Sequence, residues 1–95
     1  MDVLTEVTLT RNAEKDLRKL PRNIQEAFFT WISRISYQGL ANTRKIPGYN
    51  DEPLSGNRKG QRSVRLNKAY RAIYIQESDE KIELVTIIEV IKHKY

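Results

Sequence analysis

Residues 62–90 read RSVRLNKAYRAIYIQESDEKIELVTIIEV, and this stretch decides the fold. Over residues 62–66 polar and apolar side chains alternate with a period of two, which predicts a strand. A polar turn leads to a second strand over 70–76, and an acidic turn leads to a third strand over 82–90. This last strand is apolar on both sides, so we expect it inside the sheet.

The first half of the chain predicts one strand and two helices. Residues 3–9 alternate and indicate an opening strand. Thr10 is a suitable N-cap for a short helix, and Pro21 suits the start of a second helix. Apolar residues recur at three-to-four spacing over 24–35, and Gly39 is a suitable end. The two helices are therefore expected to form an αα-hairpin.

Residues 41–60 show no period and contain several prolines and glycines, which predicts a long functional or mobile loop. The expected order is β-α-α-β-β-β, with a helical hairpin packed on a twisted, mainly antiparallel sheet. This order belongs to the α+β class. A chain of 95 residues is too short for a second core, so residues 1–95 are predicted to form a single domain.

The composition excludes several classes of protein. The chain has no cysteine, which excludes disulfide scaffolds and cysteine nucleophiles, and its one histidine excludes a multi-histidine metal site. We expect neither a metal nor a cofactor. No apolar run approaches the roughly 20 residues of a membrane span, and the N-terminus lacks the pattern of a signal peptide. The expected location is therefore the cytoplasm.

The positive charge is concentrated in one third of the chain. The formal net charge is +5, yet residues 44–74 alone carry eight basic and two acidic residues, a net of +6. A solvated surface is the common explanation of scattered charge. Charge clustered in this way favours binding to a polyanion, above all a nucleic acid.

Three arginines of the predicted sheet are candidates for phosphate binding. Strand alternation places Arg62 and Arg65 on opposite faces, and Arg71 lies on the adjoining strand. The planar guanidinium donates two parallel hydrogen bonds to a phosphate and stays charged. We expect one of the three to pair with Glu83 or Glu89 across the sheet instead.

The C-terminus provides a second group of candidates, Lys92, His93, Lys94 and Tyr95. His93 can give or take a proton near neutral pH, and Tyr95 can stack on a base. On composition alone, a frayed end with an incidental histidine is the more common case. With arginines these residues suit metal-free RNA cleavage. In that reaction the 2′-hydroxyl attacks the phosphate, whose growing charge needs neutralising while the leaving oxygen is protonated.

The run LSGNRKGQRSVRLN over residues 54–67, followed by YRAIY over 70–74, resembles the RelE/ParE superfamily of bacterial toxins and is most similar to its HigB branch. The resemblance implies a RelE-like fold and the toxin of a type II toxin–antitoxin pair. The implied activity is that of an mRNA interferase, a ribosome-dependent endoribonuclease that cuts mRNA in the 30S decoding site and blocks translation. The implied partner is an antitoxin with a helix-turn-helix DNA-binding domain.

Carried over residue by residue, the resemblance assigns catalytic roles to four positions. Arg65 matches a basic residue of the sheet, Arg71 a phosphate-stabilising arginine, and His93 and Tyr95 the C-terminal acid/base and aromatic residues. The remaining basic residues near these positions are expected to bind RNA, namely Arg58, Lys59, Arg62, Lys68, Lys92 and Lys94.

The sequence departs from the family pattern at two positions and at its end, where His-Lys-Tyr stands in place of the Tyr-His pair that often ends HigB-like chains. Ser55 stands where some HigB toxins have a lysine, and Glu52 where some have a histidine. The hypothesis is that Lys59 or Arg62 replaces the missing lysine. Two other functions share the same pattern: a ParE-like inhibitor of DNA gyrase without nuclease activity, and an RNA-binding module without catalysis.

Overall fold

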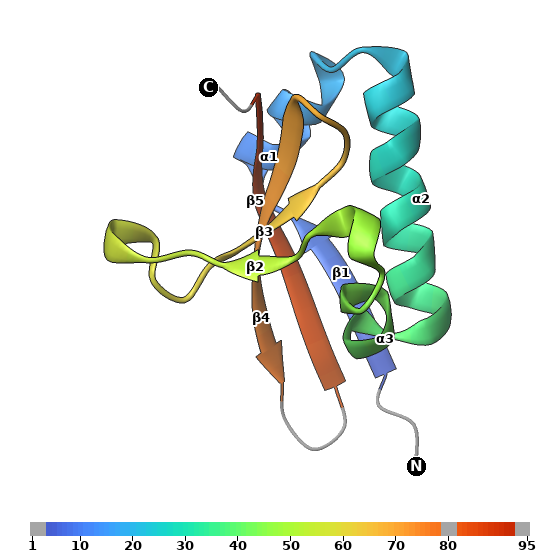
Figure 1. The fold of residues 1–95 in the computed structure, drawn as a ribbon, viewed down its shortest axis with the longest axis vertical. Helices are drawn as coiled ribbons and strands as arrows, with labels where there is room; N and C mark the ends of the chain where they lie inside the picture. The colour runs from blue at the N-terminus through green and yellow to red at the C-terminus, as the bar shows by residue number, and fades with distance from the viewer. Residues whose placement is uncertain (1–3, 79–81, 93–95) are drawn as a thin grey trace.

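The structure, a computed structural model, describes residues 4–78 and 82–92 and is built around one five-stranded sheet (Figure 1). Its strands are β1 (Leu4–Leu9), β2 (Glu52–Pro53), β3 (Arg62–Arg65), β4 (Tyr70–Ser78) and β5 (Ile82–Lys92). They lie in the order β1-β5-β4-β3-β2, with β1 and β5 parallel and the other pairs antiparallel. The apolar strand β5 has a neighbour on each side, which confirms its predicted interior position.

The helical elements all precede β3. They are α1 (Arg11–Arg18), α2 (Arg22–Gln38), α3 (Leu40–Arg44) and two 3₁₀ turns, η1 (Pro47–Tyr49) and η2 (Gly56–Arg58). The predicted α+β class is confirmed. The segment 41–60, predicted as an aperiodic loop, contains most of α3, both 3₁₀ turns and β2. These elements are two to five residues long, too short to produce a readable period.

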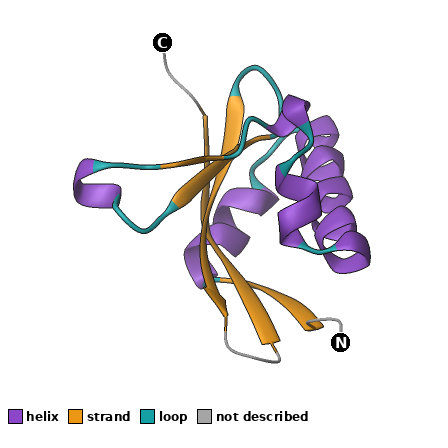
Figure 2. Cartoon of the chain, turned by 60° about the horizontal axis from the view of Figure 1, so that its bottom comes forward, coloured by secondary structure: helices purple, strands orange, loops and turns teal. Residues whose placement is uncertain are grey.

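The core lies between the sheet and the helices, which cover one face. Phe28, Trp31 and Ile35 of α2 are buried against the sheet, where Tyr74 and Ile87 are also buried. Trp31 and Tyr74 have ring centroids 5.5 Å apart, within the range of favourable aromatic pairs. In Figures 1 and 2 the helix α2 lies on one side of the sheet, while the segment around η2 projects on the other.

Two local features end and begin the helices as predicted. The hydroxyl of Thr10 accepts a hydrogen bond from the backbone N–H of Ala13 at 3.1 Å, which confirms Thr10 as the N-cap of α1. Gly39 ends α2 with φ +84° and ψ 161°, a conformation that is essentially restricted to glycine. The same residue begins α3, so the chain turns sharply there.

A β-bulge in β5 shifts the register of the central pair of strands. Tyr74 lies opposite Ile87, whereas the preceding residue, Ile73, lies opposite Glu89, so Ile88 is an extra residue. Because side chains alternate along a strand, the extra residue turns Glu89 to the face opposite the helices. We call this face of the sheet the open face.

Within the described ranges, none of the helices combines the length and the apolar composition that a membrane span requires.

Candidate nucleic-acid interface

Two arginines lie side by side on the open face. Arg65 of β3 is directly opposite Arg71 of β4 in the antiparallel register. Their neighbours Val64 and Ala72 are also opposite each other, and both belong to the helix-side core. Alternation therefore places Arg65 and Arg71 on the open face, and we call them the arginine pair. Like charges directly opposite each other repel, so an anion between them is favourable.

Arg71 holds an unused donor at this face. Its Nη1 atom is buried and has no hydrogen-bond partner among the described residues. The hydroxyl of Ser63, one row along the same face, is also buried without a partner there. A buried donor left unpaired costs about 1–3 kcal/mol, and a side-chain rotation that exposes Nη1 to a ligand oxygen recovers that cost.

A third arginine reaches the open face from a loop. Arg58 ends η2, and its guanidinium donates to Gln61 at 2.8 Å and pairs with Glu89 of β5. Glu89 lies in one row with Ile73 and Ser63, next to the row of the arginine pair. The open face thus presents three arginines and one carboxylate in two adjacent rows.

Arg62 faces the other way, as alternation predicted. It lies opposite Tyr74, a core residue, and its Nε atom donates to Asp51 at 2.6 Å. The Asp51 side chain is 1 % exposed, and it also accepts from the Tyr74 hydroxyl and pairs with Arg44 at 3.8 Å. Arg62 was predicted to bind RNA or to replace a missing lysine. Its guanidinium is instead held by a buried carboxylate on the helix side, so we leave it out of the proposed interface.

This buried network changes two pKa values. Burial raises the pKa of the Tyr74 hydroxyl, and the hydrogen bond and negative charge of Asp51 raise it further. For Arg62, burial lowers the pKa, but the hydrogen bonds and charges of Asp51 and Tyr74 together outweigh it, so the pKa lies above its ordinary value. Tyr74 therefore stays a neutral donor and Arg62 a cation, which is what the Asp51 carboxylate needs.

The prediction of which residues form ion pairs across the sheet is wrong. One of Arg62, Arg65 and Arg71 was expected to pair with Glu83 or Glu89. Arg62 pairs with Asp51 instead, and Glu89 pairs with Arg58. Glu83 accepts hydrogen bonds from Thr5, the backbone of Leu40 and Gln76 on the helix side of the sheet.

The remaining candidates lie around the arginine pair or outside the described residues. Lys59, Lys68 and Lys92 are exposed, and Lys92 lies opposite Tyr70, the residue before Arg71. His93, Lys94 and Tyr95 lie outside the described residues.

Sequence reasoning did not identify the two carboxylates that pair with arginines of the basic segment, Asp51 and Glu89. Asp51 stands in the aperiodic segment and follows Asn50, whose φ of 44° marks a left-handed turn. The sequence feature that could have identified Asp51 is that it is one of only two acidic residues within the basic segment 44–74. Glu89 was named only as an alternative partner, because the bulge that turns it outward leaves no mark in the sequence.

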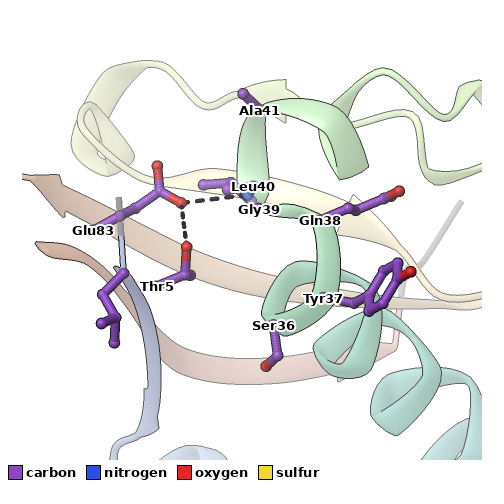
Figure 3. A pocket seen from close by; sticks show the side chains of 9 residues that line it. Thr5, Ser36, Tyr37, Gln38, Gly39, Leu40, Ala41 and Glu83 are labelled. Atoms are coloured by element: carbon purple, nitrogen blue, oxygen red, sulfur yellow. Dashed lines mark hydrogen bonds between the residues drawn. The ribbon is translucent and has the colours of Figure 1, made fainter. Parts of the chain in front are cut away.

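A cavity of about 590 Å³ lies at the other end of β5, away from the arginines (Figure 3). It is lined by residues of β1, the end of α2, α3 and Glu83, whose carboxylate is bonded to Thr5 and to the N–H of Leu40. The carboxylate of Glu83 therefore already has hydrogen-bond partners within the protein. No group of three or more acidic or histidine side chains suited to a metal ion occurs within residues 4–78 and 82–92.

Comparison with known families identifies the class. Residues 7–94 match a family model described as the ParE toxin of the type II toxin–antitoxin system parDE. The chain belongs to this family. Its place in the RelE/ParE superfamily, predicted from the motif over residues 54–67, is confirmed.

Individual relatives support the same superfamily. Toxin HigB-1 of Vibrio cholerae is 37 % identical over 62 residues, which cover 64 % of this chain and 65 % of that protein. The match therefore spans slightly less than two thirds of that relative's length.

Solved structures share the fold over nearly the whole chain. The toxin–antitoxin complex RelBE2 from Mycobacterium tuberculosis is 25 % identical with a TM-score of 0.65, covering 96 % of this chain and 100 % of that one. The RelE–RelB complex of Pyrococcus horikoshii has a TM-score of 0.70 at 20 % identity, covering 95 % and 96 %. The YoeB/ParE toxin from Agrobacterium tumefaciens has a TM-score of 0.69 at 18 % identity, covering 94 % and 99 %.

Proposed function

We propose that this protein is the toxin of a type II toxin–antitoxin module and acts as a ribosome-dependent mRNA endoribonuclease. The observation that carries the proposal is the arginine pair: Arg65 and Arg71 lie directly opposite on the open face, and Arg71 keeps a buried Nη1 atom without a partner among the described residues. Two guanidinium groups in this arrangement suit a phosphodiester.

The proposed chemistry is attack of the ribose 2′-hydroxyl on the adjacent phosphorus, followed by departure of the 5′-oxygen. Arg65 and Arg71 stabilise the charge that grows on the phosphate oxygens. His93 and Tyr95 are proposed to remove and supply the protons. His93 and Tyr95 follow Lys92, the last described residue of β5, which lies opposite Tyr70, the residue before Arg71.

The test is mRNA cleavage in a translating extract. Wild-type protein is expected to give cut mRNA, and Arg71→Met to reduce the cleavage rate by about 10²- to 10³-fold. Arg34→Met, which removes the same charge from an exposed position on α2, is the matched control and should cut like the wild type. Intact mRNA on ribosomes translating with wild-type protein would reject the proposal.

The match to the ParE toxin family favours a second candidate, inhibition of DNA gyrase without RNA cleavage. A supercoiling assay separates the two. Loss of gyrase supercoiling at toxin concentrations that leave mRNA intact would favour this candidate. A module that only binds RNA would instead give salt-sensitive RNA affinity, intact mRNA and normal supercoiling.

The proposed partners are mRNA on the 30S decoding site and a cognate antitoxin with a helix-turn-helix domain. Support for the antitoxin comes from relatives with this fold whose structures are toxin–antitoxin complexes. Expression of this protein alone should stop the growth of the host cells. Co-expression with the product of the neighbouring open reading frame, the proposed antitoxin, should restore growth and yield a stable complex.

A further inference from the structure

The segment over residues 54–61, here the 54–61 loop, projects away from the body of the sheet (Figures 1 and 2). Arg58 lies in this loop, at the end of η2. The base of the loop is closed by a backbone hydrogen bond from Leu54 to Gln61 at 2.9 Å. Towards its tip the backbone hydrogen bonds join residues within the loop, from the N–H of Arg58 to Ser55 at 3.2 Å and from the N–H of Gln61 to Arg58 at 3.0 Å. The side chain of Arg58 is therefore what ties the tip to the sheet.

The anchor for that side chain is Glu89. One end of the guanidinium donates to Gln61 within the loop, and the other pairs with Glu89 on β5, 31 residues away in sequence. The Arg58 side chain is 43 % exposed and that of Glu89 is 21 % exposed. An ion pair this accessible to water changes the equilibrium between the paired and the free arginine by only a few-fold. An anionic ligand can therefore replace Glu89 as the partner of Arg58.

The β-bulge that aims Glu89 at the open face is held by the start of α1. The carbonyl oxygen of the extra residue, Ile88, accepts from the Thr10 hydroxyl at 3.0 Å and from Asn12 at 3.4 Å. Beyond the bulge, the N–H of Val90 donates to Asp16 at 3.0 Å. Side chains of α1 thus satisfy the backbone groups that the bulge frees, so the outward position of Glu89 is built into the fold.

From these contacts we infer that Glu89 is a positioning residue, which holds Arg58 beside the arginine pair until Arg58 exchanges its carboxylate for a phosphate of bound RNA. Carboxylate and phosphate oxygens suit the same guanidinium fork, so the exchange replaces one charge-assisted pair by another. RNA then contacts three arginines: Arg58, Arg65 and Arg71. The inference rests on the proposed function for its substrate class, RNA.

The exchange predicts tighter binding without a slower reaction. Glu89→Gln removes the competing charge, so RNA affinity should rise about two- to five-fold. Once RNA is bound, its phosphate holds Arg58 in both proteins, so the cleavage rate at saturating toxin should stay within about two-fold of the wild type. A merely structural role would not improve affinity.

Binding is measured by fluorescence anisotropy with a labelled single-stranded 2′-O-methyl RNA, which cannot be cleaved, over a series of salt concentrations. Arg58→Met should weaken binding and reduce the salt slope by about 0.7, the value of one phosphate contact on a single strand. The double variant with Glu89→Gln should bind like Arg58→Met alone, because Glu89 acts through Arg58. Glu77→Gln, which removes the same charge from the far end of the open face, is the matched control and should change affinity less than Glu89→Gln.

Three results of the binding series would overturn the inference: an unchanged salt slope in Arg58→Met, a Glu89→Gln effect on affinity that persists without Arg58, or an effect equal to that of Glu77→Gln. The rate is measured in single-turnover cleavage on programmed ribosomes. Equal loss of rate and affinity in Glu89→Gln would also overturn it. Failure of the proposed function is separate: the wild type would then leave mRNA intact, whereas the binding series needs no cleavage.

Discussion

Replacing Asp51 by Asn tests whether the buried network on the helix side holds the fold together. The Asp51 side chain is 1 % exposed and faces Arg62 at 2.6 Å and Arg44 at 3.8 Å. Breaking a buried ion pair on one side costs about 3–5 kcal/mol. The side chains of Arg62 and Arg44 are 23 % and 31 % exposed, so water offsets part of this cost. We expect Asp51→Asn to lower the free energy of unfolding by about 2–4 kcal/mol.

The assay is urea unfolding followed by the emission of Trp31, the only tryptophan of the chain. Trp31 is 1 % exposed and its ring lies against that of Tyr74, so its emission reports on this part of the core. Glu52→Gln, a neighbouring exposed carboxylate, is the control and should change the free energy by less than about 0.5 kcal/mol.

A double-mutant cycle with Arg62→Met isolates the pair. The coupling free energy between positions 51 and 62 should be about 1–3 kcal/mol, because the two side chains are in direct contact. A loss below about 0.5 kcal/mol in Asp51→Asn, or additive effects in the cycle, would refute the reasoning.

Three further predictions concern the fold. The pKa of Tyr74 is raised in the folded state above its ordinary value of 10.0, so its contribution to stability is complete below that pH and is lost as the pH rises further. The difference in unfolding free energy between wild type and Tyr74→Phe should therefore shrink by about 1.4 kcal/mol per unit above pH 10, and a constant difference would contradict this. Thr10→Ala removes the cap of α1 and should cost about 1 kcal/mol in thermal or urea unfolding; no change would mean that the cap is not stabilising. Gly39→Ala should cost about 1–3 kcal/mol because φ is +84°, although its surroundings leave room for a methyl group. Gly48→Ala, also with open space and without a positive φ, is its control, and equal effects at the two glycines would argue against backbone strain.

Local patterns were sufficient to predict most of the architecture. The period of two over 62–66 and 70–76 and the apolar run over 82–90 identify three strands, and Thr10 and Gly39 mark helix ends. The sequence reveals these signals because each depends only on residues that are close together in the chain, within one helical turn or one strand. The short elements within 41–60 were missed, since tertiary contacts and not periodicity hold a two-residue strand or a 3₁₀ turn in place.

The candidate site was predicted in part. Alternation along the strands assigned Arg62 and Arg65 to opposite faces, and the structure confirms this. The sequence did not predict the partners of the arginines. Arg58 pairs with Glu89, 31 residues away in the sequence, and Arg62 pairs with Asp51 of the preceding aperiodic segment. The catalytic roles of His93 and Tyr95 remain predictions.

By itself the sequence determined the α+β class, the family motif over 54–67 and the concentration of positive charge between residues 44 and 74. The tertiary structure alone decided how that charge is divided. It turns Arg44 and Arg62 towards the buried Asp51, ties Arg58 to Glu89, and leaves Arg65 and Arg71 side by side on the open face. The physical reason is that these partners are far apart in the sequence: a loop brings Asp51 to Arg62, the register of β3 and β4 brings Arg65 to Arg71, and the bulge in β5 turns Glu89 towards Arg58.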